Sequence, residues 1–245
     1  MKRVAIVQAR TGSTRLPGKV LLELAGRPVL ARVLERLGQC RKLDETIVAT
    51  SDRENDDAIA KLCRELAIPC FRGSENDVLD RFYHAARFHK AGTIVRITAD
   101  CPLLDPGLID RMLVRFDDLA PPAGYLSNTL ERTFPRGLDV EIFSLTALAA
   151  AWRRATTPAE REHVTPYIYR HPERFRLAGF SNRTDLSHHR WTLDTPEDYE
   201  LISAIYKALD QPIRLFTTRE IVEFLDEHPE VYALNRKIVQ KETGS

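Results

Sequence analysis

Short apolar runs alternate with amphipathic helical patterns along the first hundred residues of this chain. The apolar runs are 4–7, 46–50, 69–71 and 93–98. The stretches with apolar residues at helical spacing are 28–37, 56–66 and 78–88. Each apolar run has the length of a buried strand, and each stretch between them has the length of a helix. This alternation predicts an α/β fold with a mostly parallel sheet and helices on both faces. Ligands of such sheets bind beyond the carboxyl ends of the strands.

The second half of the chain has a less regular pattern. A break is expected at 121–124, a half-exposed strand at 138–143 and a strand that ends at Asp194, before a helix with Pro196 in its first turn. Further helices are expected at 147–154, 159–170 and 217–225. Since no linker stands out, we predict one domain over residues 1–245.

Aromatic residues gather in the central part of the chain. Trp152, Tyr167 and Tyr169 lie in a stretch at about 129–176 that the first half of the chain does not need for its core. Aromatic residues are enriched in interfaces between subunits. We therefore expect a symmetric homodimer, with this insertion forming the dimer interface.

Charge and composition exclude several classes of protein. The chain has 36 Lys and Arg against 35 Asp and Glu, a net charge of +1, which argues against a general nucleic-acid or membrane-surface binder. No run of about 18 apolar residues is present, so no membrane span is expected. The four cysteines lack the spacing of a zinc site and fit reduced thiols. We predict a cytoplasmic location.

The loop at 8–19 follows the first apolar run and carries three cations. These cations are Arg10, Arg15 and Lys19. Backbone N–H groups at Gly12 and Ser13 are free to bind phosphate oxygens, and the cations would neutralise the phosphate charge. The loop does not match the Walker pattern. A solvated basic turn is the alternative, but three cations this close together repel one another unless an anion is bound.

Asp100 and Asp194 each follow a predicted strand. Carboxylates that meet at one edge of a sheet repel each other unless a cation joins them. Mg²⁺ prefers a few carboxylates together with phosphate oxygens and waters. We therefore predict a magnesium site formed by Asp100 and Asp194. The alternative for Asp194 is an N-terminal cap of the helix that follows it.

The loop at 8–19 resembles that of the CMP-sugar synthetases, which activate 3-deoxy-manno-octulosonate and sialic acids. The resemblance extends over roughly 4–206 and is greatest to the branch named for spore coat polysaccharide biosynthesis. Three later motifs occur in the order of that family: Arg72-Gly73-Ser74 with 77–81, then 96–103, then 191–198. The resemblance implies a Rossmann-like sheet of the nucleotide-diphospho-sugar transferase type, CTP and Mg²⁺ as requirements, and a homodimer.

The resemblance also implies roles for individual residues. The nucleotide-binding positions are Ala9, Arg10, Gly12, Ser13, Arg15, Lys19, Arg72, Ser74, Thr98 and Asp100. Among them, Arg72 and Ser74 fall where the family approaches the cytosine and the ribose. The catalytic positions are Arg10, Arg15, Lys19 and Asp100. Asp100 and Asp194 match the two metal-ligating aspartates.

Three further segments are candidates for contact with the acceptor, the sugar-like molecule that would receive the nucleotidyl group. The insertion at about 129–176 is expected to form part of this acceptor site. They are Arg136 with Asp139 and Glu141, then His163, then His189 with Arg190. Asp139 and Glu141 are two residues apart, so they share one face of a strand and either bind sugar hydroxyls or a second metal, or face solvent. His163 contacts the acceptor or the phosphate, or lies at a surface or interface. His189 and Arg190 meet an acidic acceptor or are ordinary surface residues.

These features predict attack of an acceptor oxygen on the α-phosphorus of CTP, with pyrophosphate as the leaving group. Positioning and charge neutralisation would supply most of the acceleration. A glycosyltransferase that binds a nucleotide-sugar is the first alternative, but the motif at 99–101 offers only Asp100 where such enzymes use two aspartates. A non-catalytic nucleotide-binding module is the second, and it would be expected to lack a loop cation or a metal ligand.

Overall fold

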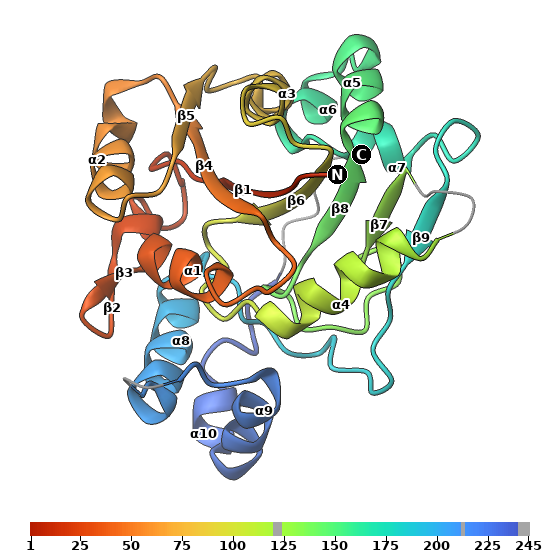
Figure 1. Ribbon diagram of the computed structural model, residues 1–245. Coiled ribbons are helices and arrows are strands. Elements are labelled where there is room, and N and C mark those ends of the chain that lie inside the picture. The colour runs from red at the N-terminus through yellow and green to blue at the C-terminus, as the bar shows by residue number, and fades with distance from the viewer. Residues whose placement is uncertain (120–123, 212–213, 240–245) are drawn as a thin grey trace.

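The computed structural model describes residues 1–119, 124–211 and 214–239 of the chain. Its main sheet has seven strands in the order β5-β4-β1-β6-β8-β7-β9 (Figure 1). These are β1 (Arg3–Gln8), β4 (Glu45–Ser51), β5 (Cys70–Gly73), β6 (Thr93–Thr98), β7 (Tyr125–Ser127), β8 (Glu141–Ser144) and β9 (Leu177–Gly179). Among them β8 alone is reversed, since it pairs antiparallel with both β6 and β7. The predicted α/β fold with a mostly parallel sheet is confirmed.

Helices cover both faces of the sheet (Figure 1). They are α1 (Val29–Leu37), α2 (Asp57–Glu65), α3 (Val78–Phe88), α4 (Pro106–Asp117), α5 (Leu145–Arg154), α6 (Pro158–His163), α7 (Pro166–Tyr169), α8 (Pro196–Leu209), α9 (Thr218–Glu227) and α10 (Pro229–Tyr232). Short elements complete the described chain: the 3-10 turns η1 (Lys19–Leu21) and η2 (Glu54–Asp56), and the hairpin of β2 (Glu23–Leu24) and β3 (Arg27–Pro28). No helix in the described ranges is both long and apolar enough to cross a membrane.

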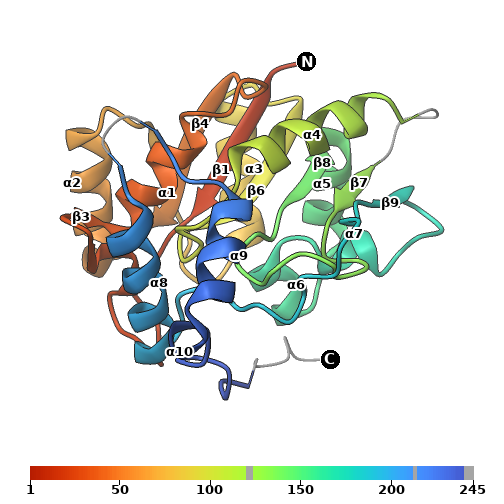
Figure 2. The same cartoon turned by 90° about the horizontal axis from the view of Figure 1, so that it is seen from below.

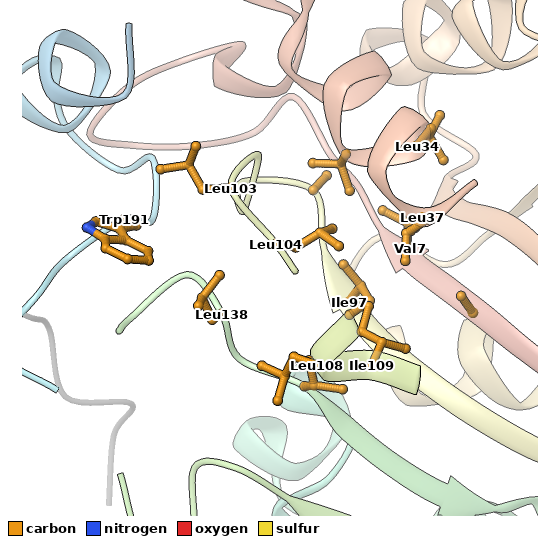
Figure 3. Close-up of a cluster of buried hydrophobic side chains, with 14 of the residues drawn as sticks. Val7, Leu34, Leu37, Ile97, Leu103, Leu104, Leu108, Ile109, Leu138 and Trp191 are labelled. Carbon is orange, nitrogen blue, oxygen red and sulfur yellow. The ribbon is translucent and has the colours of Figure 1, made fainter. Parts of the chain in front are cut away.

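Alternating side chains of β1 supply both layers of the core. Val4 and Ile6 face the layer formed with α3 and α5, whereas Ala5 and Val7 face the layer formed with α1 and α4. On the second face α8, α9 and α10 pack beside α1 and α4 (Figure 2). Figure 3 shows how Trp191, far along the chain, joins Leu103 and Leu138 in this second layer.

The structure corrects three expectations for the second half. The helix expected at 159–170 is two short helices, because Val164 takes φ +71° and Pro166 has no N–H to continue a helix. The strand expected at 138–143 begins only at Glu141. The strand expected to end at Asp194 is absent from the described residues directly before it. Only an isolated bridge between Arg136 and Arg190 lies there. Of the break expected at 121–124, residues 121–123 lie outside the described part.

Gly137 lies where two segments cross closely. Its φ is +100°, and a Cβ added there would lie 2.5 Å from the carbonyl carbon of Trp191. The backbone N–H of Trp191 donates to Arg136 O at 2.6 Å beside this crossing. A side chain at position 137 would push apart the two segments that carry the bridge between Arg136 and Arg190.

We therefore predict that Gly137→Ala lowers the free energy of unfolding by more than about 2 kcal/mol, because strain and a backbone clash add together. Urea-induced unfolding measures this change. Gly179→Ala is the matched control, since nothing lies within 4 Å of its added Cβ. Equal stabilities of the two variants would contradict the close crossing.

Candidate functional site

A cleft of about 570 Å³ opens at the carboxyl ends of β1 and β6, where Gln8 and Thr98 line it. Predicted site residues that line the cleft are Arg10, Gly12, Ser13, Arg15, Lys19, Thr98, Asp100, Arg136, Asp139, His163 and Asp194. They come from both halves of the chain. The fold therefore brings the loop at 8–19, both candidate metal ligands and part of the candidate acceptor segment into one space.

Asp56 fixes the shape of the loop at 8–19. Its Oδ1 accepts hydrogen bonds from the N–H and the hydroxyl of Thr11, both at 2.8 Å, and its Oδ2 accepts one from the Ser51 hydroxyl at 2.5 Å. Burial raises the pKa of the Asp56 carboxyl, but these hydrogen bonds outweigh burial and hold the pKa below its ordinary value. Asp56 was not predicted, because its sequence position reads only as the start of a helix.

The ammonium group of Lys19 lies between Asp100 and Asp194. Its Nζ is 2.5 Å from Asp100 Oδ2 and 2.7 Å from Asp194 Oδ1. Two arginines hold the other oxygen of Asp194, Arg15 at 3.0 Å and Arg190 at 2.8 Å. The two aspartates, 94 positions apart, thus share one cation. The sequence predicted their proximity because each was expected to end a strand at the same edge of one parallel sheet. The structure achieves it through the Lys19 contact and a hydrogen bond from Leu193 N to Asp100 O at 2.8 Å.

The contacts between Lys19 and the aspartates shift the pKa values of Lys19 and Asp194. Burial lowers the pKa of Lys19, but the charges of Asp100 and Asp194 outweigh burial and raise the pKa above its ordinary value. Burial raises the pKa of the Asp194 carboxyl, but Lys19, Arg15 and Arg190 outweigh burial and lower the pKa. Both groups are therefore charged at neutral pH.

Asp194 does not cap the helix that follows it, so that alternative is wrong. The cap of α8 is Thr195, whose hydroxyl accepts from Asp198 N, while the Asp198 carboxylate accepts from Thr195 N. Asp198 is fully buried and also binds Arg190 at 2.9 Å. Asp198 was not predicted, yet through Arg190 it determines where Asp194 lies.

Several predicted residues lie outside the cleft lining. Ala9 is buried in the backbone ladder, where its N–H donates to Ala49 O. Arg72 donates to Ser51 O and Arg53 O, and Ser74 accepts from Asp77 N. The predicted contacts of Ala9, Arg72 and Ser74 with the nucleotide therefore stay predictions.

The candidate acceptor residues divide between several environments. Asp139 and Glu141 do not share an exposed strand face: Asp139 precedes β8 and forms a two-point ion pair with Arg132, while Glu141 is buried against Arg96, Tyr125 and Thr165. His163 lines the cleft, and burial lowers its pKa.

His189 and Arg190 are buried rather than exposed. They line a second, smaller cavity instead of the cleft. The alternative that they are ordinary surface residues is therefore wrong, and their contact with an acidic acceptor stays a prediction. Arg190 forms ion pairs with both Asp194 and Asp198.

Arg81 is a further charged residue that was not assigned. It is 1% exposed, its Nη1 donates to Ser74 O at 2.7 Å, and its Nε and Nη2 have no partner in the described chain. Burial lowers its pKa to about 10. Gly73 lies against its side chain, and the neighbouring Glu75 reaches toward Gly12 of the loop at 8–19. Arg81 thus lies under the segment beside the loop.

The side chains of the cleft supply only some of the ligands that a magnesium ion needs. In the described residues, no group of three or more His, Cys, Asp or Glu side chains lies close enough to hold a metal. Asp100 and Asp194 together offer two carboxylates. Mg²⁺ commonly takes one or two carboxylates and completes its shell with phosphate oxygens and waters, so these residues suit a metal that arrives with a nucleotide.

A cleft of this kind, with loop cations opposite two carboxylates at the carboxyl edge of a parallel sheet, defines a nucleotidyltransferase-type α/β enzyme. The chain belongs to the cytidylyltransferase family, whose model matches residues 4–232. It is therefore a cytidylyltransferase. The resemblance found in its motifs is confirmed, and the glycosyltransferase and non-catalytic alternatives are not supported.

Relatives and solved structures agree with this family. The chain is 36% identical to spore coat polysaccharide biosynthesis protein SpsF of Bacillus subtilis over 233 residues, 92% of this chain and 94% of that protein. It is 40% identical to a 3-deoxy-manno-octulosonate cytidylyltransferase of Trichlorobacter lovleyi over 116 residues, 47% of this chain and 45% of that protein. A cytidylyltransferase structure from Leptospira borgpetersenii is 33% identical, with a TM-score of 0.91 over 99% of this chain and 100% of that chain.

We predict that Lys19→Met lowers the free energy of unfolding at pH 7 by about 2–3 kcal/mol, because it removes the cation from two half-buried carboxylates. The lowered pKa of Asp194 means that its ion pairs stabilise the fold above pH 4 and that this stability is lost as the pH falls through the folded pKa. The loss caused by the substitution should therefore shrink below about pH 4.

Urea-induced unfolding at several pH values checks this prediction. Lys61→Met is the matched control, because the Lys61 side chain is exposed and pairs only loosely with Glu65. A pH-independent effect of Lys19→Met would contradict the shared-cation arrangement.

Proposed function

We propose that the protein transfers CMP from CTP to a hydroxyl group of a sugar or sugar-acid acceptor, releases pyrophosphate and requires Mg²⁺. The observation that carries this proposal is the meeting of Arg10, Arg15 and Lys19 with Asp100 and Asp194 in one cleft. The family supports cytidylyl transfer. The name of the Bacillus subtilis relative supports an acceptor that enters polysaccharide biosynthesis.

Different residues of the cleft have different roles in the proposed reaction. Arg10, Arg15 and Lys19, with the N–H group of Gly12, bind the triphosphate and stabilise the charge of the leaving pyrophosphate. The Ser13 N–H, which was expected to be free, donates instead to Thr11 O at 2.8 Å. Asp100 and Asp194 would hold a magnesium ion, which would neutralise charge on the phosphate oxygens. Before substrate binds, Lys19 keeps the two carboxylates together, so their positions are already determined when the nucleotide arrives.

The acceptor side of the cleft is formed by Arg136, Asp139 and His163. Because burial lowers the pKa of His163, its imidazole is neutral at pH 7 and can accept a hydrogen bond from an acceptor hydroxyl. Arg136 supplies a cation for an acidic acceptor. Glu141 positions Arg96, which also lines the cleft, rather than meeting a sugar.

The test is pyrophosphate release from a set of triphosphates and candidate acceptors. CTP should support turnover only with an acceptor. Asp100→Asn and Asp194→Asn should each lower kcat by about 10²–10³, the usual cost of losing one charge-stabilising group. Asp118→Asn is the control, since this exposed aspartate directly follows α4 as its C-cap. Turnover with a nucleotide-sugar instead of CTP, or normal activity of Asp194→Asn, would overturn the proposal.

We infer that Arg81 binds the polar edge of the cytosine base. Its two unpartnered guanidinium nitrogens are buried under the segment at 73–75, and a base that inserts beside Gly12 would offer them oxygen and nitrogen acceptors. Arg72 and Ser74 would then act from outside the lining, Ser74 by holding Asp77 at the start of α3.

Arg81→Lys keeps the charge but loses the planar donor pair. It should raise KM for CTP by about tenfold, the value of one hydrogen bond to a charged group, and leave KM for the acceptor unchanged. Steady-state kinetics with each substrate varied separately measure both constants. Equal KM values for CTP in the variant and the wild type would refute the assignment.

We also propose that the chain is a single domain that works as a cytoplasmic homodimer. Of the aromatic residues expected at the interface, Trp152 stacks on Tyr83 with ring centroids 4.3 Å apart, and Tyr167 is 7% exposed. Within the insertion at 129–176, Leu130 is instead an exposed apolar side chain, at 43%. The interface is proposed to include Leu130.

Light scattering at micromolar concentration should give the mass of a dimer. Leu130→Glu should give a monomer, because a charge buried at the interface would be unpaired. Val114→Glu, at an equally exposed apolar position on α4, should leave the dimer intact. A monomeric wild type would refute the homodimer.

A further inference from the structure

A second cavity of about 160 Å³ lies behind the cleft, between the segment at 187–191 and the end of the described chain at 232–238. It contains the paired histidines that the cytidylyltransferase reaction leaves unused. Arg136 is the one described residue that lines both the cleft and this cavity. The cavity is therefore a separate space with one wall in common with the active site.

Two buried polar atoms of the cavity wall have no hydrogen-bond partner. Trp191 is completely buried and His189 is 4% exposed, yet Trp191 Nε1 and His189 Nδ1 both lack a partner in the described chain. Figure 3 shows the indole nitrogen of Trp191 on the side turned away from Leu103 and Leu138. Buried polar atoms in proteins are almost always hydrogen-bonded, so an unpaired donor against a cavity indicates an occupant.

The chemistry of the wall identifies the class of occupant. An indole N–H can only donate a hydrogen bond, so the occupant must be an acceptor. The described charged residues of the lining are Arg136, Arg190 and Arg236, and no acid is among them. Burial, with help from His188, lowers the pKa of His189 to about 4, so its neutral ring carries one proton, which Nδ1 can hold toward an acceptor.

We propose that this cavity is a binding site for a small oxyanion, a phosphate or carboxylate group, held by Trp191 Nε1, His189 Nδ1 and Arg236. It explains why His189 and an indole N–H are buried together beside arginines. The site does not require the proposed reaction. If that reaction holds, the shared Arg136 links the two spaces, so an anion in the cavity competes with an acidic group in the cleft for the same guanidinium.

Trp191 itself reports on the site. The chain has two tryptophans, so Trp152→Phe leaves Trp191 as the sole source of tryptophan fluorescence. Adding inorganic phosphate should shift its emission along a saturable curve, because the indole N–H gains an acceptor. Arg236→Gln in this background should weaken phosphate binding about tenfold, the value of one charge-assisted hydrogen bond.

Lys237→Gln is the matched control. It makes the same change of charge one residue along, at an exposed side chain outside the lining, and should leave phosphate affinity unchanged. Arg15→Gln separates the cavity from the cleft, because a phosphate bound by the loop at 8–19 would be lost and one bound in the cavity would be retained. Acetate in place of phosphate separates a carboxylate ligand from a phosphate ligand, and saturable binding of either supports the site.

Three results would overturn the site. They are an emission spectrum that phosphate and acetate leave unchanged, equal weakening by Arg236→Gln and Lys237→Gln, and loss of the signal in Arg15→Gln. A crystal structure grown with phosphate in which only water meets Trp191 Nε1 would also overturn it. None of these measurements uses CTP or an acceptor, so failure of the cytidylyl transfer assay and failure of this site can be told apart.

Discussion

The ammonium group of Lys19 is the contact on which the rest of the site depends. It joins Asp100, which follows a central strand, to Asp194, which precedes a helix nearly a hundred residues later. Two carboxylates with 22% and 13% of their side chains exposed would otherwise repel each other in a partly dry cleft. One lysine from a glycine-containing loop thus makes the negative half of the site possible. It also keeps the loop at 8–19 against that half.

A network of buried ion pairs and hydrogen bonds holds Asp194, one of these two aspartates, in position. Arg190 binds both Asp194 and Asp198, and Asn235 donates at 2.8 Å both to Asp198 and to the carbonyl of Arg190. Each buried charge is paired, which is the condition under which such a network costs little. The network fixes the backbone turn before α8 without a strand. Geometry that a parallel sheet usually provides comes here from ion pairs.

The first half of the fold could be predicted from hydrophobic periodicity, because its strands and helices bury regular faces. The bounds of α3 and β6 agree with the sequence pattern residue for residue. The loop at 8–19 and Asp100 could be placed because each follows such a strand. In the second half the helices α5, α8 and α9 could also be predicted. The strand bounds and the break between α6 and α7 could not, since Val164 interrupts a helical pattern and Trp191 is buried without belonging to a strand. Asp56, Arg81 and Asp198 were missed because a buried charged residue looks like a surface one in a sequence.

The order in which these parts leave the ribosome has a consequence for the newly made chain. The loop at 8–19 and β1 are made well before Asp194, Asp198 and Asn235, since Asp194 follows Lys19 by 175 positions. Contacts between such distant positions form late because a long loop must close first. A chain made only as far as Asp100 therefore carries Arg10 and Arg15 without Glu162 and Asp194, the carboxylates that pair with them. The site is complete only once the segment around Asn235 has docked against Arg190 and Asp198.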